Sequence, residues 1–176
     1  YAKQGQFEKA IESHEKSLTI YRETKGRTFE GNGLQNLGNV YKLVGRDDKA
    51  VEYYNQALTV RREVKYRVGE GDVLNNLSDS YSRLNRDEEA IRAQEQALVI
   101  YRELKYRLGE GTALLTMGVS HAKLGNYEKA LETYLNLQTK STGDGVVAEI
   151  ANACELKCPK CKKFTCWDPA PEREHK

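Results

Sequence analysis

Proline and cysteine are scarce in this sequence, and long apolar runs are missing. The 176 residues include 3 prolines and 4 cysteines, and all the cysteines lie between Cys154 and Cys166. A secreted fold that disulfides hold together carries cysteines throughout its core, so we expect the cysteine-free remainder to be intracellular and cytoplasmic. No apolar run approaches the ~20 residues that span a bilayer, and the first residues lack the apolar stretch of a signal peptide. We therefore expect no membrane span.

A strong excess of charge of one sign is also missing. The formal net charge is +2, whereas a dedicated nucleic-acid binder carries a clear basic excess. The sequence has neither a Gly-x-x-x-x-Gly-Lys phosphate loop nor a Gly-x-Ser-x-Gly nucleophile elbow. Its histidines, His14, His121 and His175, are far apart. We therefore expect no nucleic-acid partner, no enzymatic activity and no small-molecule substrate.

The sequence does contain a repeat with a period of 40 residues. Residues 30–65 are identical to residues 70–105 at 15 of 36 positions, where ordinary residue frequencies would give roughly two or three identities by chance. The block Glu-Gly-x-x-Leu recurs from Glu30, Glu70 and Glu110. Self-similarity at such a period is the signature of a solenoid built from short structural units.

Each repeat begins with a helical pattern. Apolar or small residues recur at i, i+3, i+4 and i+7 from Leu34 to Tyr41, which is the spacing of one face of an α-helix. Gly45 follows, and Asn85 and Gly125 stand at the equivalent positions. Because Gly and Asn tolerate a left-handed backbone, we expect the first helix of each repeat to end there.

A second helical pattern follows this stop. Asp47 and Asp87 stand where a side-chain oxygen can cap the new helix. Apolar and small residues then recur at helical spacing over residues 50–58. We expect this helix to continue through Lys65, with a short loop at residues 66–67 that returns the chain to the next repeat.

These motifs resemble the tetratricopeptide (TPR) repeat. The resemblance lies in the pattern Leu-x-x-Leu-Gly-x-x-Tyr, a small-residue break, and an Ala-x-x-x-Tyr-x-x-Ala helix. The 40-residue form, with Gly-Glu-Gly before its first helix, is similar to the arrays of Pins/LGN-type polarity adaptors, kinesin light chains and bacterial signalling proteins. The resemblance implies an all-α fold, a right-handed superhelical solenoid of antiparallel helix pairs. Two residues depart from the pattern, since Gln94 and His14 stand where an aromatic residue is usual.

The repeat frame divides the chain into three parts. We predict a TPR array of about three and a half repeats over residues 1–140, then a linker and capping helix over 141–156, and a flexible, basic, cysteine-containing tail over 157–176. The array comprises a partial repeat and three further units, at 1–29, 30–69, 70–109 and 110–140. Because the chain starts inside a repeat and without Met, we expect it to be a piece of a longer protein.

The first helices of a TPR solenoid line its concave groove. We predict that this groove binds a peptide or helix of a partner protein. Asn36 and Asn76 recur at one repeat position, as the ladder asparagines of TPR grooves do, and a carboxamide can both donate to and accept from a peptide backbone. The alternative is that this row is an ordinary solvated helix face. The predicted partner-binding residues are Gln35, Asn36, Asn39, Asn75, Asn76, Asp79, Arg83, Leu115, Thr116 and Lys123.

One type of TPR ligand does not match this groove. TPR domains that hold chaperone tails resemble a clamp in which Lys and Arg grip two carboxylates. The clamp positions here hold Gln35, Thr112 and Thr116. Since these side chains lack the positive charge that pairs with a terminal carboxylate, we do not expect an Hsp90 or Hsp70 tail as partner.

The tail contains all the cysteines. Cys158 and Cys161 have the Cys-x-x-Cys spacing of a zinc knuckle, and Cys154 and Cys166 could complete a four-thiolate site. The intervals between them are tighter than in usual zinc modules, so free thiols in an unstructured tail, or a redox pair, are the alternatives. Our prediction for cofactors is none, with zinc at these four residues as the alternative.

Three functional hypotheses follow from the sequence. The first is a protein-interaction scaffold or adaptor that holds a partner segment in its groove. The second is a regulatory TPR segment of a larger signalling protein or transcription regulator. The third is a zinc-dependent module in the C-terminal tail.

Overall fold

The computed structural model describes residues 2–140, with side chains from residue 6 to residue 136. This part of the chain is all helical and confirms the predicted all-α TPR-type solenoid. The predicted capping helix and the four cysteines lie outside the described residues. The helices are α1 (Ala2–Glu23), α2 (Arg27–Leu43), α3 (Asp47–Glu63), α4 (Arg67–Arg83), α5 (Asp87–Glu103), α6 (Arg107–Lys123) and α7 (Tyr127–Lys140).

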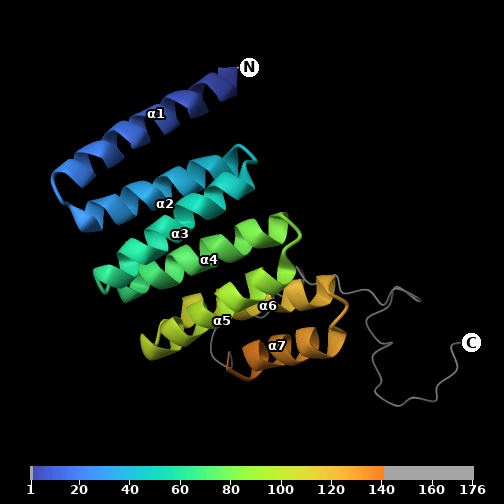
Figure 1. Cartoon of the computed structure of the whole chain (residues 1–176). Coiled ribbons are helices and arrows are strands. Elements are labelled where there is room, and N and C mark those ends of the chain that lie inside the picture. The colour runs from blue at the N-terminus through green and yellow to red at the C-terminus, as the bar shows by residue number, and fades with distance from the viewer. Residues whose placement is uncertain (1, 141–176) are drawn as a thin grey trace, which may run out of the picture. The chain divides into compact units, whose positions relative to one another are not determined.

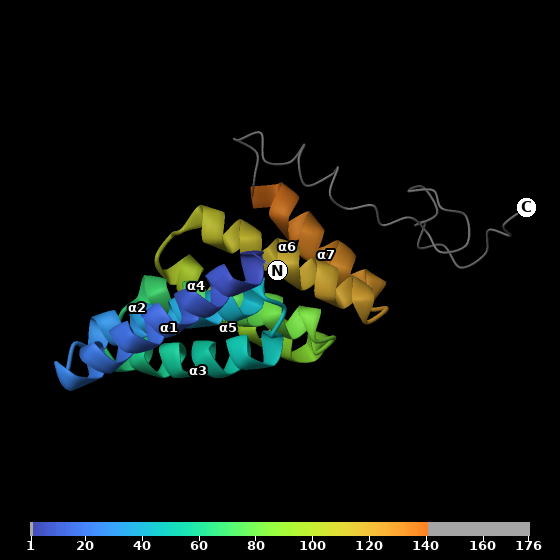
Figure 2. The same ribbon diagram turned by 90° about the horizontal axis from the view of Figure 1, so that it is seen from above.

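Successive helices stack side by side in chain order, from α1 to α7 (Figure 1). The closest packing joins α2 to α3 and α4 to α5, and α4 also contacts both α2 and α6. The first helices therefore lie near one another along one side of the stack. Seen from above, α3 and α7 run in different directions, so the pairs rotate along the array (Figure 2).

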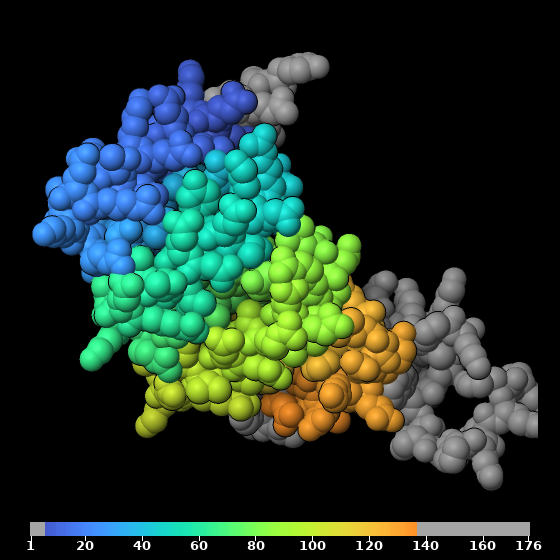
Figure 3. All heavy atoms as spheres, viewed as in Figure 1, coloured from blue at the N-terminus to red at the C-terminus, as the bar shows by residue number. Residues whose placement is uncertain are grey.

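The core lies inside and between the helix pairs. At most 1% of the surface of Leu34, Leu37 and Tyr54 is exposed, and Ala50 and Ala57 are fully buried. Burial of such side chains is worth about 1.5–3 kcal/mol for each large one, and it supplies the main stabilisation of a solenoid. On the face seen in Figure 3, side chains fill the spaces between neighbouring helices.

Small residues at the helix crossings allow this close packing. A Cβ atom added to Gly38 would lie 2.5 Å from the ring of Tyr54, and one added to Gly118 would lie 2.5 Å from the ring of Tyr134. In the α4–α5 pair, Ser78 replaces this glycine and the fully buried Gln94 replaces the tyrosine. The departure of Gln94 from the TPR pattern is thus accompanied by a change at the position it packs against.

Each repeat has two helix-ending turns, one inside the pair and one between pairs, and the sequence predicted the first. Gly45, Asn85 and Gly125 have positive φ, as expected. The N–H of Gly45 bonds to the Lys42 carbonyl and the next N–H to the Tyr41 carbonyl, which is a Schellman ending.

The turn between repeats was placed incorrectly. Helix α3 ends at Glu63, because Lys65 has a φ of 55°, and so the prediction that the helix continues through Lys65 is wrong. The next helix begins at Arg67, so the Gly-Glu-Gly block lies in its first turn and not before it. Lysine is an uncommon residue at positive φ, and no feature of the local sequence marks it as a helix stop.

The predicted aspartate caps are also wrong. Asp47 is the first helical residue of α3, the N-cap is Arg46, and no side chain caps this end. The buried carboxylate of Asp47 instead accepts a hydrogen bond from Arg83 Nε, which lies 3.0 Å from its nearer oxygen. A negative charge at this position still interacts favourably with the helix dipole.

Candidate functional site

The ten predicted binding residues lie on the three first helices of the helix pairs. We call the surface of α2, α4 and α6 that carries them the first-helix face; its members also include the equivalent residues Asn32, Lys42, Asp72, Ser82, Thr112, Val119 and Ala122. Asn36, Asp79, Arg83 and Lys123 are exposed, and the other predicted residues are half-buried. Because α4 contacts both neighbouring first helices, the face is continuous.

Two of the predicted asparagines are engaged inside the helix pairs. The hydroxyl of Tyr54 donates to Asn39 Oδ1 at 2.7 Å, and Gln94 Nε2 donates to Asn75 Oδ1 at 2.8 Å. Burial raises the pKa of Tyr54, so its hydroxyl stays protonated and remains a donor. These two carboxamides therefore satisfy buried polar groups of the second helices.

Gln35 is engaged by a residue that the sequence analysis did not single out. Arg61 of α3 is 2% exposed, and its Nη2 donates to Asn32 Oδ1 at 2.6 Å and to Gln35 Oε1 at 3.1 Å. The signal was present in the repeat frame, because Tyr21 and Tyr101 occupy the positions 40 residues before and after Arg61.

The cations of the first-helix face connect neighbouring repeats. Lys42 Nζ lies 2.9 Å from Asp79 Oδ2 and 3.4 Å from Asn76 Oδ1. Lys123 Nζ donates to Ser82 Oγ at 2.7 Å. Arg83 reaches back in the same way to Asp47, in the preceding repeat. Each of these contacts joins two consecutive first helices or their pairs, so the cations bridge neighbouring repeats.

The remaining groups of the face are the ones that a partner could engage. Asn36 is exposed, and its carboxamide has no hydrogen-bond partner among the described residues. Asn76 uses only its oxygen, in the long contact with Lys42. At the α6 end the face is apolar, with Leu115 half-buried and Val119 41% exposed. The hydroxyl of Thr116 bonds to the carbonyl of its own helix.

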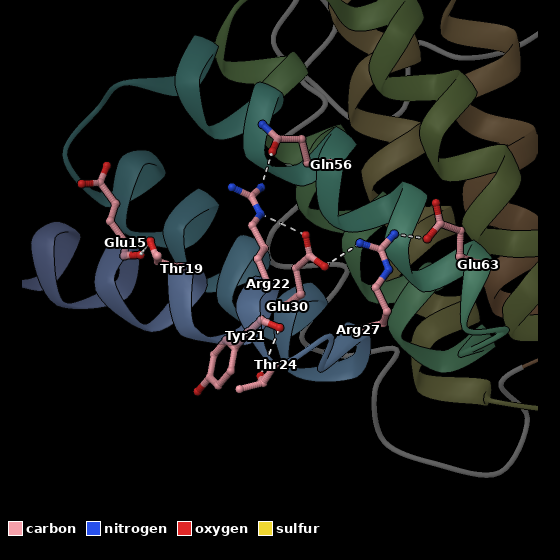
Figure 4. Close-up of polar contacts among 9 residues, drawn as sticks. All are labelled: Glu15, Thr19, Tyr21, Arg22, Thr24, Arg27, Glu30, Gln56 and Glu63. Carbon is pink, nitrogen blue, oxygen red and sulfur yellow. Dashed lines mark hydrogen bonds and ion pairs between the residues drawn. The ribbon is translucent and has the colours of Figure 1, made fainter.

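A second set of polar contacts recurs where one pair meets the next (Figure 4). Arg22 Nε lies 3.1 Å from one oxygen of the buried Glu30, and Arg27 Nη1 lies 2.5 Å from the other. Arg27 also pairs with Glu63 of α3. Arg22 donates to Gln56 as well. The network thus links α1, α2 and α3 through one carboxylate.

The same network forms one repeat later. Glu70 lies 2.8 Å from Arg62 Nε and 2.7 Å from Arg67 Nη1, and Arg67 pairs with Glu103. Burial alone would raise the pKa of Glu70, but the hydrogen bonds from Arg62 and Arg67 outweigh it and the pKa is lowered. The glutamate of the Gly-Glu-Gly block is therefore a structural ion-pair centre.

No group of three metal-ligating side chains converges within the part of the chain that the structure describes. The zinc hypothesis concerns Cys154, Cys158, Cys161 and Cys166, which lie outside that part, and it stays a prediction. Of the described helices, none combines the length and the apolar character that crossing a bilayer requires.

Three solved structures share this architecture at low sequence identity. BtubC (BKLC) from P. vanneervenii gives a TM-score of 0.70 at 20% identity, over 100% of this chain and 65% of that chain. A putative kinesin light chain of Podosopora anserina, with nearly identical TPR-like repeats, gives 0.67 at 18%, over 90% and 74%. A signal transduction ATPase (STAND) protein of Pyrococcus horikoshii, with a tetratricopeptide repeat sensor, gives 0.66 at 22%, over 84% and 24%. These likenesses show the fold.

The sequence itself also matches a family. The tetratricopeptide repeat family matches over residues 1–63, 32–103 and 69–135, so the three windows together cover the array. The comparison with curated proteins gives no match. Arrays of this kind present extended surfaces for protein–protein interaction and are typically not enzymes. With its 40-residue frame, its helix pairs and this match, the chain belongs to the tetratricopeptide repeat family.

Proposed function

We propose that this array is an adaptor that holds a peptide or helical segment of a partner protein on its first-helix face. The observation that carries the proposal is the exposed, unpartnered carboxamide of Asn36, on a face that continues over Asn76 and Asp79 to Leu115 and Val119. A carboxamide can bind a peptide backbone because it both donates and accepts hydrogen bonds. The apolar end can bury an apolar side chain of the same segment.

The contacts of the face divide the predicted residues by role. Gln35, Asn39 and Asn75 already accept hydrogen bonds from second-helix side chains, and we assign Asn39 and Asn75 to supporting the face. Asn36 and Asn76 retain free amide groups, and we assign them to direct contact with the partner. Arg83 and Lys123 bond to residues of the preceding repeat, Asp47 and Ser82, and border the first-helix face.

The experiment compares two double variants. Asn36→Ala with Asn76→Ala should abolish quantitative capture of the partner from lysate, while the helical circular dichroism spectrum and the unfolding midpoint stay within a few degrees of the unmodified chain. The matched control is Asn55→Ala with Asn136→Ala, because both residues are exposed asparagines outside the first helices. Unchanged capture by the first variant, or equal loss in the control, would reject the first-helix face as the binding surface.

The proposal also includes the setting in which the array works. We propose a cytoplasmic location, because residues 1–153 lack cysteine. Microscopy of the tagged full-length protein tests this, and enrichment in a secretory compartment would contradict it.

A second candidate is a sensor segment inside a larger signalling protein. One observation favours it: the STAND protein, which has a tetratricopeptide repeat sensor, is matched over 24% of its length. The test is the complete reading frame around residues 1–176. An adjoining nucleotide-binding or DNA-binding domain would support the sensor and reject the free-standing adaptor.

A further inference from the structure

Arg61 is a buried cation without an acidic neighbour at ion-pair distance. Its side chain leaves α3 and ends between α2 and α4, with 2% of the residue exposed. Thirteen ion pairs shorter than 4.0 Å occur among the described residues, and Arg61 takes part in none of them. An arginine side chain stays charged in a protein, so this positive charge has no direct counter-ion.

The neighbours of Arg61 supply only neutral or aromatic contacts. Nη2 donates to the amide oxygens of Asn32 and Gln35, and the guanidinium carbon lies 5.0 Å from the ring centre of Tyr66. Nε and Nη1 are buried without any hydrogen-bond partner. Glycines 31 and 69 provide the space: a Cβ added at either position would lie 3.3 Å or less from a guanidinium nitrogen.

Asp72 is the acidic residue whose charge acts on Arg61 most clearly, but it does not neutralise it. The two groups interact electrostatically without forming an ion pair. Asp72 is half-buried, its carboxylate is hydrogen-bonded to Tyr101, and burial raises its pKa. The charge of Arg61 therefore has no direct ion-pair partner, and its guanidinium lies buried in contact with Asn32 and Gln35.

The repeat frame makes this arginine an exception. The residue 40 positions earlier is Tyr21, and the residue 40 positions later is Tyr101. Tyr101 occupies the equivalent slot between Gly71 and Gly109, so an aromatic side chain fits this environment. A buried, incompletely satisfied cation costs stability relative to such a residue. Departures of this kind from local rules are expected at functional sites.

We propose that the missing counter-ion is a glutamate or aspartate side chain of the partner segment. This inference rests on the adaptor function proposed above. The incoming carboxylate replaces the two amide oxygens at Nη2, and the amide groups of Asn32 and Gln35 rotate so that their NH₂ groups donate to the same carboxylate. A carboxylate brings the opposite charge to the guanidinium, whereas the amide oxygens that it replaces are neutral acceptors.

The site lies next to the residue that we assign to backbone binding. Asn32 and Asn36 are separated by one helical turn and lie on the same side of α2. One partner segment can therefore place its backbone at Asn36 and its acidic side chain at Arg61. We assign a side chain in preference to a terminal carboxylate, because only a carboxylate on a flexible stem reaches a guanidinium that lies below Asn32 and Gln35.

The test uses random peptides of fixed length as the probe, displayed in one library with blocked C-termini and in another with free C-termini. Selection on the unmodified array should enrich peptides with Glu or Asp at one fixed position in the blocked library. Arg61→Tyr should bind a selected peptide at least tenfold more weakly, with an unchanged or higher unfolding midpoint. Arg92→Gln is the matched control, because it removes an exposed cation from another second helix, α5, and it should retain binding.

A second measurement does not depend on a variant. The buried Nε–H group of Arg61 should give a protected NMR signal, and that signal should shift when the selected peptide is added. Enriched peptides without a fixed acidic residue, or equal binding by Arg61→Tyr, would overturn the inference and leave the adaptor function intact. Enrichment only in the free C-terminus library would overturn the side-chain assignment. No enrichment in either library would contradict both proposals.

Discussion

The α2–α3 and α4–α5 pairs use the same helix frame with different side chains at their crossings. In the first pair Tyr54 packs on Gly38 and donates to Asn39. In the second pair, the smaller Gln94 occupies the equivalent space and donates to Asn75. Two changes compensate each other and keep the backbone geometry. Ser78 stands where the first pair has Gly38, and the smaller Gln94 stands where it has Tyr54. The unit that specifies this fold is thus a group of interacting positions, and the predictions below separate its members.

The largest effect is expected at the crossing of α2 and α3. Gly38→Ser adds an atom where a Cβ would lie 2.5 Å from the Tyr54 ring, and overpacking of this kind costs about 1–3 kcal/mol or more. Adding Tyr54→Gln should recover a large part of that loss, because it recreates the pair found in α4 and α5. Urea unfolding of the two single variants and the double variant measures the coupling. Strictly additive losses would show that the two crossings are not interchangeable.

The next effect concerns the ion-pair centre at the start of α4. Glu70→Gln leaves the two arginines with a neutral acceptor, and we expect a loss of about 1–3 kcal/mol at neutral pH. Glu103→Gln is the control, since its carboxylate is half exposed, and it should lose less than about 1 kcal/mol. Thermal unfolding followed by circular dichroism distinguishes the two. Equal losses would contradict a special role for the buried glutamate.

The same glutamate makes stability depend on pH. Because its pKa is lowered in the folded state, its stabilising contribution is complete above the unfolded pKa of about 4.3 and is lost as the pH falls through the folded value. The unfolding free energy of the unmodified chain should therefore fall more steeply than that of Glu70→Gln as the solution is acidified below about pH 5. Parallel curves for the two proteins would show that Glu70 does not contribute to the acid sensitivity.

A smaller effect is expected from the hydroxyl of Tyr54. Tyr54→Phe keeps the ring against Gly38 and removes the donor to Asn39, which should cost about 1 kcal/mol. The comparison is Tyr53→Phe on the same helix, because Tyr53 is less buried and stacks on Tyr41. Chemical denaturation of both variants tests whether the carboxamide contact, and not the loss of a hydroxyl in general, causes the change.

The smallest effect is expected between the two pairs. Asp79→Asn removes the charge that Lys42 faces at 2.9 Å, and an exposed pair of this type contributes about 0.2–1 kcal/mol. The loss should disappear in high salt, because screening already weakens the pair in the unmodified chain. A loss that persists in molar salt would indicate that Asp79 acts through packing or hydrogen bonding.

Much of the architecture could be predicted from the sequence. The 40-residue period and the Leu34 to Tyr41 face indicated helix pairs of the TPR type, and Gly45 marked a true helix stop. The stop at Lys65 could not be predicted, because a lysine in the left-handed conformation carries no local signal. Asp47 was misread as a cap, since its arginine partner stands one repeat later in the chain.

The first-helix face was predicted as a location but not as a set of free groups. All ten predicted residues lie on α2, α4 and α6. Sequence periodicity could not reveal that Asn39 and Asn75 turn toward the second helices, because that depends on whether a buried Tyr or Gln reaches them. It also passed over Arg61, which lies on a second helix and gains its importance only through its neighbours on α2 and α4.

The sequence by itself determined the repeat length, the two helices of each repeat and the positions of the small residues between them, because these follow from local periodicity and backbone preference. The tertiary structure decided which polar side chains are satisfied and which remain available. That decision depends on contacts between residues up to 41 positions apart, such as Lys123 and Ser82. Such contacts exist only after the repeats have stacked, since stacking alone fixes which side chains can meet.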